Sequence, residues 1–252
     1  MRIVKGLVSV IMPAYNAEKT INRSLNSILE QSYSNFELFI IDDCSSDKTL
    51  QIINSYNDER IILIKNDKNL GAPKSRNKAI EKARGEFICF QDADDEWHLN
   101  KIQMQVDFLR ETKAPLSAHG YKMIKESGKS IVYSPPRSVQ YKDLLRYNVI
   151  SNCATMLNMN VIGKKIFFKD LNSRQDHAMS LEITKKYGPA KCIPDILLKV
   201  FIQTNSVSSN KFQAILDQWH LYRNVEKINL ISSLILIISW ALKGYFKYSK
   251  FS

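Results

Sequence analysis

Residues 7–43 read LVSVIMPAYNAEKTINRSLNSILEQSYSNFELFIIDD, an apolar run, an amphipathic stretch and a second apolar run that ends in two aspartates. The two apolar runs, residues 7–12 and 36–41, have the length and composition of buried strands. Between them, residues 18–30 place apolar side chains at i, i+4, i+7 and i+8, which predicts a helix with Asn16 as a candidate N-cap. This order predicts a parallel βαβ unit.

The same alternation continues through the first part of the chain. Strands are expected at residues 61–64 and 86–90, and helices at residues 48–55 and 74–83. The repetition of strand and helix predicts an α/β fold, with a Rossmann-like, mainly parallel sheet flanked by helices.

The second half of the chain follows a less regular pattern. Strands are expected at residues 116–124, 131–133, 153–157 and 196–202, and helices at residues 141–146, at residues 176–186 and from residue 211 onward. The sequence has no internal repeat or Gly/Ser-rich linker. We therefore expect one domain over residues 1–210 and a C-terminal helical extension over residues 211–252.

The composition limits the class of protein. The chain has 252 residues, with 36 Lys and Arg against 25 Asp and Glu, and a formal net charge of +11. Its 44% of hydrophobic residues is enough for a buried core, which excludes an intrinsically disordered chain. The positive charge indicates an anionic partner, which the charge alone leaves open between nucleic acid, a phosphorylated ligand and a membrane surface.

Polar and acidic residues follow three of the expected strands. They are Pro13, Ala14 and Tyr15 after the first strand, Asp42 and Asp43 after the second, and Asp92, Ala93, Asp94 and Asp95 after the fourth. Because such sheets bind ligands along the edge formed by the carboxyl ends of their strands, we expect these residues to border one cleft. Several carboxylates in a basic chain indicate a metal ion or a polar ligand there.

The motif Asp92-Ala93-Asp94 is the candidate metal site. If the strand conformation continues through it, the side chains of Asp92 and Asp94 point the same way and face one hard divalent cation, Mg²⁺ or Mn²⁺. Such an ion takes its remaining ligands from water and phosphate oxygens. For this motif alone, a solvated loop is the alternative.

Two cations, Lys74 and Arg76, lie at the start of an expected helix, directly after a turn that contains Gly71 and Pro73. Cations are unfavourable at a helix N-terminus, which carries a partial positive charge. A bound anion would remove the conflict, since cations and free backbone N–H groups together form a phosphate site. Two solvated surface cations are the alternative.

Four motifs in this part of the chain resemble those of the family 2 glycosyltransferases, which have the GT-A fold. They are VIMPAYN at residues 10–16, IDDCSSD at residues 41–47, NLG at residues 69–71 with SRN at residues 75–77, and QDADD at residues 91–95. Cys44 stands where the family usually has Gly. Later segments, among them SRQDHA at residues 173–178, resemble the bacterial branch that builds capsule, O-antigen and teichuronic acid polysaccharides.

The resemblance implies a nucleotide-binding half over residues 1–112 and an acceptor-binding half over residues 113–210. It also implies a role for each residue of the donor site. Pro13, Ala14 and Tyr15 would hold the nucleoside, Asp43 with Asp42 the uracil ring, Arg76 the base or diphosphate, Asp92 and Ala93 the ribose or sugar, and Lys211 the leaving diphosphate. Asp94, together with Asp92, would bind the Mn²⁺ or Mg²⁺ that bridges the diphosphate oxygens.

The resemblance further implies that Asp176 is the general base, in a motif that usually reads Glu-Asp and here reads Gln175-Asp176. An inverting transfer needs one carboxylate to take the proton of the acceptor hydroxyl and a cation to stabilise the departing nucleotide. Trp97 and His177 are candidate acceptor-binding residues, and for each a structural role in the core is the alternative.

The implied function is the inverting, metal-dependent transfer of a sugar from a nucleotide diphosphate sugar to a lipid-linked oligosaccharide in bacterial surface polysaccharide synthesis. A uridine diphosphate (UDP) sugar is the expected donor. The Gln-x-x-Arg-Trp pattern of processive family members does not occur in the sequence. We therefore expect the addition of one sugar per encounter.

Residues 228–242, INLISSLILIISWAL, form an uncharged, mostly apolar run between Lys227 and Lys243. A helix of this run reaches about 22 Å, short of the ~30 Å hydrocarbon core of a bilayer. The aromatic and basic residues 244–252 are typical of lipid headgroup regions. Because the apolar run at residues 7–13 is too short for a signal peptide, we expect a cytoplasmic protein, peripheral on the inner face of the cell membrane. A helix packed on the domain, or a subunit contact, is the alternative.

Other classes of protein share some of these features. A nucleic-acid-binding protein would explain the positive charge, but the acidic strand ends would repel a nucleic-acid backbone. A nucleotidyltransferase or a dinucleotide-dependent oxidoreductase would share the α/β pattern, but no Gly-rich loop follows the first strand. A carbohydrate-binding protein without catalysis stays open.

Overall fold

The computed structural model describes residues 3–171, 173–202 and 211–249. Its first half alternates strand and helix. The elements are β1 (Val4–Ala14), α1 (Ile21–Leu29), β2 (Phe36–Asp42), α2 (Thr49–Asn54), β3 (Ile61–Lys65), α3 (Ala72–Lys82) and β4 (Gly85–Phe90). Every strand and helix predicted for this half is present, with ends shifted by a few residues.

The second half contains short strands between longer helices. The elements are β5 (Glu96–Trp97), α4 (Lys101–Thr112), β6 (Leu116–Lys125), β7 (Ser130–Tyr133), β8 (Ser138–Val139), α5 (Tyr141–Arg146), the 3₁₀ turn η1 (Asn152–Ala154), β9 (Met156–Asn158), α6 (Met159–Ile162), α7 (Gln175–Tyr187) and β10 (Ala190–Ile202). Sequence analysis missed α4, although Ile102, Val106 and Leu109 occupy one helical face and are buried.

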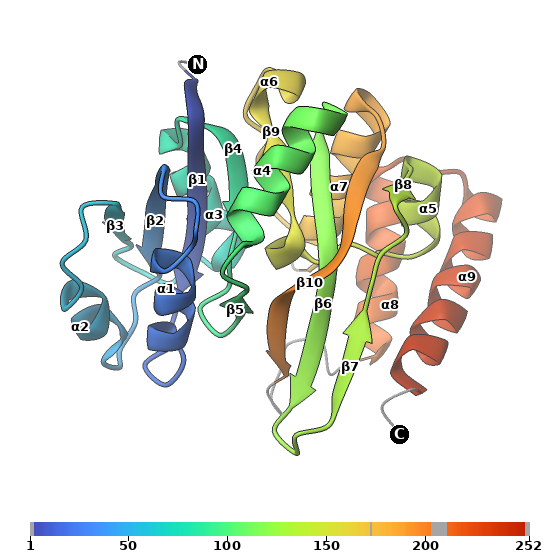
Figure 1. Cartoon of the computed structure of the whole chain (residues 1–252). Helices are drawn as coiled ribbons and strands as arrows, with labels where there is room; N and C mark the ends of the chain where they lie inside the picture. Colours follow the sequence, from blue (N-terminus) through green and yellow to red (C-terminus); the bar gives the residue numbers. More distant parts are fainter. Residues whose placement is uncertain (1–2, 172, 203–210, 250–252) are drawn as a thin grey trace.

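Ten strands of the described chain form one sheet in the order β3-β2-β1-β4-β9-β6-β10-β5, with β7 beside β6 and β8 beside β10 (Figure 1). β1 is parallel to β2 and β4, β2 is parallel to β3, and β6 is parallel to β10. β9 is antiparallel to both of its neighbours, β4 and β6, and so joins two parallel blocks. The predicted α/β fold with a mainly parallel sheet is confirmed.

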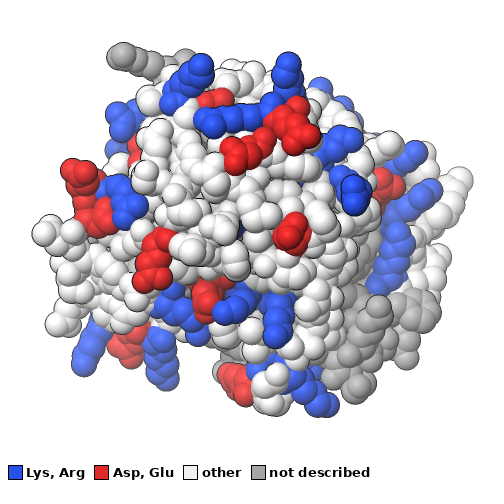
Figure 2. Space-filling model, viewed as in Figure 1, with Lys and Arg blue, Asp and Glu red and all other residues white. Residues whose placement is uncertain are grey.

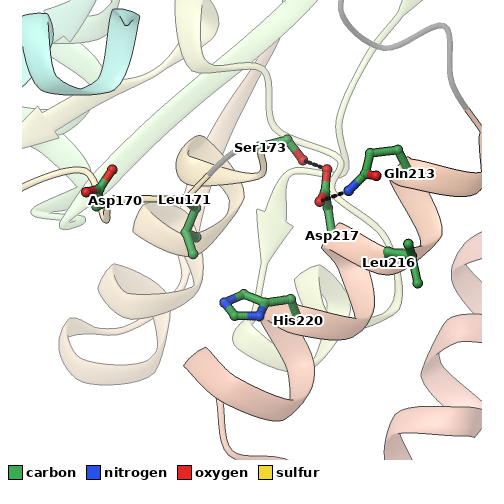
Figure 3. Close-up of a pocket in the computed structure, with 7 residues that line it drawn as sticks. All are labelled: Asp170, Leu171, Ser173, Gln213, Leu216, Asp217 and His220. Carbon is green, nitrogen blue, oxygen red and sulfur yellow. Dashed lines mark hydrogen bonds between the residues drawn. The ribbon is translucent and has the colours of Figure 1, made fainter. Parts of the chain in front are cut away.

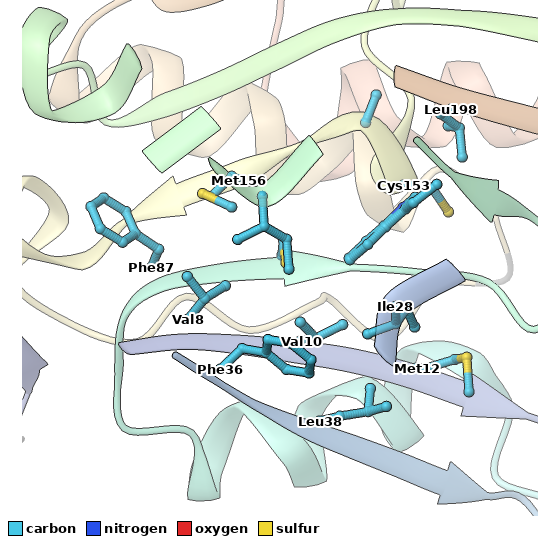
Figure 4. Close-up of a cluster of buried hydrophobic side chains, with 14 of the residues drawn as sticks. Val8, Val10, Met12, Ile28, Phe36, Leu38, Phe87, Cys153, Met156 and Leu198 are labelled. Atoms are coloured by element: carbon cyan, nitrogen blue, oxygen red, sulfur yellow. The ribbon is translucent and has the colours of Figure 1, made fainter. Parts of the chain in front are cut away.

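Side chains alternate along β1 between two buried clusters, one on each face of the sheet. Val8, Val10 and Met12 belong to one cluster, which Figure 4 shows with Phe36 and Leu38 of β2, and Ile11 belongs to the other. α1 and α4 cover the first face, and α3 and α7 cover the second. Each fully buried aliphatic side chain contributes about 1.5–3 kcal/mol to stability, so the central strands hold the domain together.

Asn16 does not cap α1, contrary to the expectation from sequence. The helix begins at Ile21, after Thr20, and Asn16 has a φ of +48°. Its side-chain oxygen accepts a hydrogen bond from the Ser46 amide (2.9 Å) instead. Asn tolerates this left-handed conformation, so Asn16 connects the loop after β1 to the loop after β2.

The C-terminal part of the chain contains α8 (Lys211–His220), the π-helical turn η3 (Leu221–Val225) and α9 (Leu230–Ser249). The long helix expected from residue 211 is therefore interrupted, and Lys227, with a φ of +55°, turns the chain before α9 begins. α9 lies against α5 and α8 (Figure 1). Across the three described ranges, no helix is long and apolar enough to cross a membrane. The linker preceding residue 211 lies outside the described residues.

Candidate active site

The carboxyl ends of β1 and β2 are held side by side. Ala14 lies opposite Asp42 in the register of the two strands, and the Asp43 amide donates to the Ala14 carbonyl oxygen (2.8 Å). Pro13 and Ala14 are buried, whereas Tyr15 is 51% exposed. Pro13 and Ala14 therefore lie beneath the surface at the end of β1, and the Tyr15 ring is accessible to a ligand.

Asp43 is buried and accepts three hydrogen bonds. Oδ1 accepts from Asn66 Nδ2 (2.7 Å) and from the Leu70 amide (2.8 Å), and Oδ2 accepts from the Gly71 amide (2.8 Å). Gly71 has a φ of +81°, a conformation that glycine adopts without strain, and directly precedes α3. Asp43 therefore fixes the loop that starts α3, and any hydrogen bond to a nucleobase uses the acceptor capacity that remains.

Asp42, the last residue of β2, is also buried. Its Oδ1 has no hydrogen-bond partner among the described residues. An unpaired buried carboxylate oxygen is unfavourable, so a donor group on a bound ligand would stabilise it. The two adjacent aspartates therefore differ. Protein groups donate three hydrogen bonds to the Asp43 carboxylate, whereas one carboxylate oxygen of Asp42 has no donor among the described residues.

Arg76, on α3, pairs with Asp92 through its guanidinium group (2.5 Å to Oδ1). The Arg76 side chain is only 11% exposed, and its guanidinium carbon lies 5.3 Å from the centroid of the Phe168 ring. The ion pair joins the start of α3 to the turn after β4. The two cations predicted at the helix N-terminus thus have carboxylate partners in the structure, because Lys74 also pairs with Asp170 (3.1 Å).

The chain turns directly after β4 and does not continue as a strand. The Asp95 amide donates to the Asp92 carbonyl oxygen (3.2 Å), which closes a turn that contains Asp94. α1 holds this turn, because Arg23 donates to the Asp94 carbonyl (2.5 Å) and Ser24 to the Asp95 carbonyl (2.6 Å). The premise that Asp92 and Asp94 share one side of an extended strand is therefore wrong.

A different set of side chains comes together at this turn. Among the described residues, ligand atoms of Asp92, Asp95 and Cys153 lie within 4.8 Å of one another, and Asp94 is not in this group. Carboxylate oxygens are the donors that Mg²⁺ and Mn²⁺ prefer, whereas a thiol is a poor ligand for such cations. Asp92 and Asp95 therefore fit a hard divalent cation, and Asp94 as a ligand stays a prediction.

Burial raises the pKa of Asp95 well above its usual range, and the nearby carboxylates of Asp92 and Asp94 raise it further. Burial also raises the pKa of the Cys153 thiol, which lies against the carboxylates of Asp92 and Asp95. Asp95 is 4% exposed, and its Oδ1 accepts a hydrogen bond from the Phe201 amide (3.3 Å). A cation at this group would favour the ionised form of Asp95, which the protein alone disfavours.

Asp176 lies in the first turn of α7, where the helix dipole favours a negative charge. Its Oδ2 lies 3.4 Å from Asn148 Nδ2. Gln175 Nε2 donates to the Leu171 carbonyl oxygen (2.6 Å), a bond that a glutamate carboxylate could not make. The departure from the usual Glu-Asp motif therefore stabilises the loop before α7.

Trp97 and His177 are buried in the core, which favours the structural role for both, and their contact with an acceptor sugar stays a prediction. Trp97 is 3% exposed, and Nζ of Lys101 lies 3.6 Å from its ring centroid. His177 is fully buried, and its Nε2 donates to the Leu144 carbonyl oxygen (2.9 Å). Burial lowers the pKa of His177, which keeps the imidazole neutral.

Sequence analysis placed Asp95 at the cleft but not among the metal ligands, and it missed Cys153. Asp95 follows the Asp92-Ala93-Asp94 motif directly, so a third carboxylate could have been included with the pair. Cys153 reaches the site from η1, more than fifty residues further along the chain, and no sequence signal connects it to the turn. Lys211 is the first residue of α8, and its side chain lies outside what the structure describes.

Positive and negative side chains are interspersed over the face of the molecule seen in Figure 2. On the described part of this face, blue and red groups alternate and do not form a continuous basic track. A nucleic-acid-binding protein would need such a track along the phosphate backbone. This face therefore gives no support to nucleic-acid binding.

Comparison with known proteins identifies relatives over nearly the whole chain. Residues 9–170 match the family model described as glycosyl transferase family 2. The chain is 34% identical over 241 residues to the putative teichuronic acid biosynthesis glycosyltransferase TuaG of Bacillus subtilis, covering 94% of this chain and 95% of TuaG. It is 34% identical over 242 residues to the UDP-Glc:alpha-D-GlcNAc-diphosphoundecaprenol beta-1,3-glucosyltransferase WfaP of Escherichia coli, with 96% and 95% covered.

Solved structures share the fold at lower sequence identity. Residues 1–349 of S. aureus TarS, in complex with UDP-GlcNAc, superpose with a TM-score of 0.69 at 23% identity, over 89% of this chain and 67% of that TarS fragment. The mannosyltransferase PcManGT from Pyrobaculum calidifontis, in complex with GDP-Man and Mn²⁺, has a TM-score of 0.67 at 16% identity, over 92% and 68% of the two chains. These similarities confirm the GT-A fold.

Proposed function

The chain belongs to glycosyl transferase family 2, and we propose that it catalyses the inverting, metal-dependent transfer of a sugar from a UDP-sugar to a lipid-linked oligosaccharide. The product belongs to a bacterial surface polysaccharide such as a capsule or an O-antigen. The observation that carries the proposal is the junction of Asp92, Arg76 and Asp95 at the carboxyl ends of the strands, beside the loop fixed by Asp43.

The donor nucleotide binds along the carboxyl ends of β1 and β2. The exposed Tyr15 ring packs against the nucleoside above Pro13 and Ala14, and Asp42 offers its unpaired oxygen to a donor group of the base. Relatives support uridine, because the names of two E. coli relatives that are 34% and 31% identical to this chain, WfaP and WfgD, specify UDP-Glc.

The diphosphate lies at the start of α3, beside Arg76. Asp92 and Asp95 would hold Mn²⁺ or Mg²⁺ there, with Asp94 as a further candidate, and the ion would neutralise the phosphate oxygens and stabilise the leaving nucleotide. The guanidinium of Arg76 already lies at this position and can donate to a phosphate oxygen in place of Asp92.

Asp176 takes the proton from the acceptor hydroxyl as that oxygen attacks C1 of the donor sugar. The N-terminus of α7 favours its ionised form, which is the form that accepts a proton. A single displacement of this kind inverts the configuration at C1 and needs no covalent intermediate. Lys211, at the start of α8, stays a proposed contact of the leaving diphosphate.

The acceptor is proposed from the relatives and from an apolar surface on the C-terminal helices. WfaP is named for a GlcNAc attached to diphosphoundecaprenol, a membrane lipid. α9 exposes large apolar side chains along one side, and two of the exposed apolar side chains of α8 are grouped with them: Leu230, Ile231, Leu234, Ile235, Ile238 and Leu242 on α9, and Phe212 and Ile215 on α8. We call this set the apolar face.

An anionic lipid surface suits the apolar face because the surrounding sequence is positively charged. Residues 227–252 include Lys227, Lys243, Lys247 and Lys250 and no Asp or Glu. The opposite side of α9 packs on the domain, where Ser233 is fully buried and Trp240 lies 5.1 Å from the Arg174 guanidinium carbon. One side of α9 is thus packed on the domain and the other is exposed. We propose that the exposed side lies on the membrane, and that the protein is peripheral on the cytoplasmic face.

Calorimetry with a panel of UDP- and GDP-sugars tests the proposal, with Mn²⁺ or with a chelator present. Wild-type protein should bind one UDP-sugar in a metal-dependent way, and Asp92→Asn should weaken this binding about tenfold or more. Asp67→Asn, at an exposed residue outside the junction, is the matched control and should bind as wild type does. Binding of equal strength with the chelator would overturn metal dependence, and binding of GDP-sugars alone would overturn the uridine donor.

A further inference from the structure

We propose that a cavity between α8 and the segment before α7 binds a sugar of the acceptor glycan, an inference that rests on the proposed function. The cavity has a volume of about 320 Å³ and is lined by Asp170, Leu171 and Ser173 on one side and by one face of α8 on the other (Figure 3). Its size is at the lower end for small-molecule sites, which suits one or two sugar units better than a nucleotide sugar.

Asp217 of α8 is the central polar group of this cavity. Ser173 Oγ donates to its Oδ2 (2.5 Å), and Gln213 Nε2 donates to its Oδ1 (2.8 Å), as Figure 3 shows. Each carboxylate oxygen can accept one more hydrogen bond. The two contacts therefore hold Asp217 in place and leave it able to accept bonds from the hydroxyl groups of a sugar.

The lining favours an uncharged, hydroxyl-rich ligand. Asp170 and Asp217 place two carboxylates at the cavity, which disfavours a phosphate group by like-charge repulsion. His220 offers a further hydrogen-bonding group, and Leu171 and Leu216 offer apolar surface for the C–H faces of a sugar ring. This mixture of a few polar groups with apolar side chains is typical of small-molecule sites.

The segment that lines the cavity on one side is bonded to α3, a helix of the candidate active site. Asp170 pairs with Lys74 (3.1 Å) on α3, the helix that also carries Arg76. Two hydrogen bonds between Asn77 and the backbone of Phe168, each 2.8 Å, fix the segment before Asp170 against α3. The other end of the lining segment leads directly into α7 and its first-turn carboxylate. One ion pair therefore joins a lining residue to α3, and the lining segment is followed in the sequence by the first turn of α7, which carries the proposed base.

The cavity also adjoins the apolar face, because α8 contributes to both. Leu216 and Asp217 line the cavity, while Phe212, 70% exposed, and Ile215 belong to the apolar face. A glycan attached to a lipid in the bilayer would therefore be presented beside the cavity when α8 and α9 lie on the membrane.

A second cavity of the same volume provides a control. It lies between α1 and β5, and its lining includes Arg23, Glu96 and Leu99. All of its lining residues come from the first 99 positions of the chain, and none comes from α7 or α8. Leu99 and Leu216 are both exposed leucines at the rim of a cavity, at 54% and 45% exposure. Leu99→Trp and Leu216→Trp therefore form a matched pair.

Steady-state transfer should be measured with the UDP-sugar found by calorimetry and a short-chain lipid diphosphate carrying one GlcNAc. Leu216→Trp should raise the KM for this acceptor about tenfold, because the indole fills the cavity, and Asp217→Asn should raise it about threefold or more. The dissociation constant of the UDP-sugar should not change in either variant. Leu99→Trp should leave both constants at the wild-type value.

The outcomes separate the inference from the function on which it rests. Transfer by wild type with an unchanged acceptor KM in Leu216→Trp and Asp217→Asn would overturn the cavity as the acceptor site and leave the proposed function intact. No transfer by the wild-type protein to any lipid-linked sugar would overturn the proposed function and the inference together. An equal rise of the KM in Leu99→Trp would show a nonspecific effect and would also overturn the inference.

Discussion

The two blocks of strands in the central sheet, which we call its first side (β1 to β4) and its second side (β5 to β10), are built differently. β1 to β4 are connected by helices and paired in parallel, so that all four strands place their carboxyl ends at one edge. On the other side, β9 is a three-residue antiparallel strand between β4 and β6, and β10 returns to pair with β6, β5 and β8. The first side forms its site from neighbouring loops, whereas the second contributes single residues from distant segments.

The functional groups follow this division. Asp43 and its hydrogen-bonded loop lie within the first side, and all of their contacts come from neighbouring strands and helices. Asp176 and Cys153 come from the second side, on α7 and η1. The edge proposed to bind the nucleotide therefore follows from the order of the strands, whereas the groups proposed for catalysis and for the acceptor depend on how the second side packs against the first.

The largest effect is expected at Asp176, on the second side. Asp176→Asn should lower the transfer rate about 10²–10⁴-fold, because the amide cannot accept the proton of the acceptor hydroxyl. The affinity for the nucleotide sugar should stay the same, since that site is on the first side. Steady-state kinetics and calorimetry on the same preparation check both statements, with Asp107→Asn on α4 as the control. Near-normal turnover would mean that the base lies elsewhere.

The next effect is expected at Asp43, on the first side. Asp43→Ala leaves three donors, Asn66 Nδ2 and the amides of Leu70 and Gly71, without their acceptor. The free energy of unfolding should fall by about 2–4 kcal/mol, measured by urea denaturation, and nucleotide binding should be lost with the loop. Asp67→Ala, in the same region but exposed, should change stability by less than about 0.5 kcal/mol. Equal stabilities of the two variants would contradict the assigned role of Asp43.

A smaller effect is expected at the apolar face. The double variant Ile235→Ser/Ile238→Ser removes two side chains that are 62% and 61% exposed. Sedimentation with anionic vesicles should show at least about a tenfold loss of binding, because each buried CH₂ contributes roughly 0.8 kcal/mol. Val132→Ser, at an exposed residue of β7, is the control. A double variant that binds vesicles as wild type does, but forms different oligomers, would identify the face as a subunit contact.

The smallest effect is expected from the protonation of Asp95, where the two sides meet. Because burial raises the pKa of Asp95 in the folded state, the folded protein binds this proton more tightly than the unfolded chain does. Without metal, the free energy of unfolding should therefore fall as the pH rises from the ordinary aspartate pKa of 3.8 through the raised pKa of the folded state.

Asp95→Asn should remove this loss and increase the free energy of unfolding at pH 7, because the amide stays neutral and so needs no proton uptake on burial. Urea denaturation in a chelator at pH 5 and at pH 7 measures the difference. Added Mn²⁺ should stabilise the wild type more than the variant. A wild-type protein whose stability rises between these two pH values, with Asp95→Asn unchanged, would contradict the effect of burial.

Much of the first side could be predicted from the sequence. Its strands are continuous apolar runs and its helices have one apolar face, so local periodicity identifies each element, and parallel pairing then places Asp42, Asp43 and Asp92 at one edge. The prediction failed where tertiary contacts replaced a local rule. Asn16 bonds to Ser46 across two loops, and the turn at Asp94 is held by α1.

On the second side, the sequence predicted elements but not their environment. Trp97 and His177 are residue types that bind sugars as readily as they pack in a core, and only the tertiary structure shows that they are buried, at 3% and 0% exposure. The same holds for α9, whose apolar run is compatible with a packed helix and with a membrane surface. Burial depends on what lies opposite a side chain, which a local pattern does not contain.

The sequence by itself determined the α/β fold class, the family and the residues that border the nucleotide-binding edge, because strand and helix periodicity and short motifs are local properties. The tertiary structure alone decided that Asp95 and Cys153 join Asp92, that Arg76 and Lys74 pair with carboxylates, and that Ser173 donates a hydrogen bond to Asp217 in the lining of a cavity. Most of these partners are 16 or more residues apart in the sequence, and only the packing of helices and loops around the sheet brings them together.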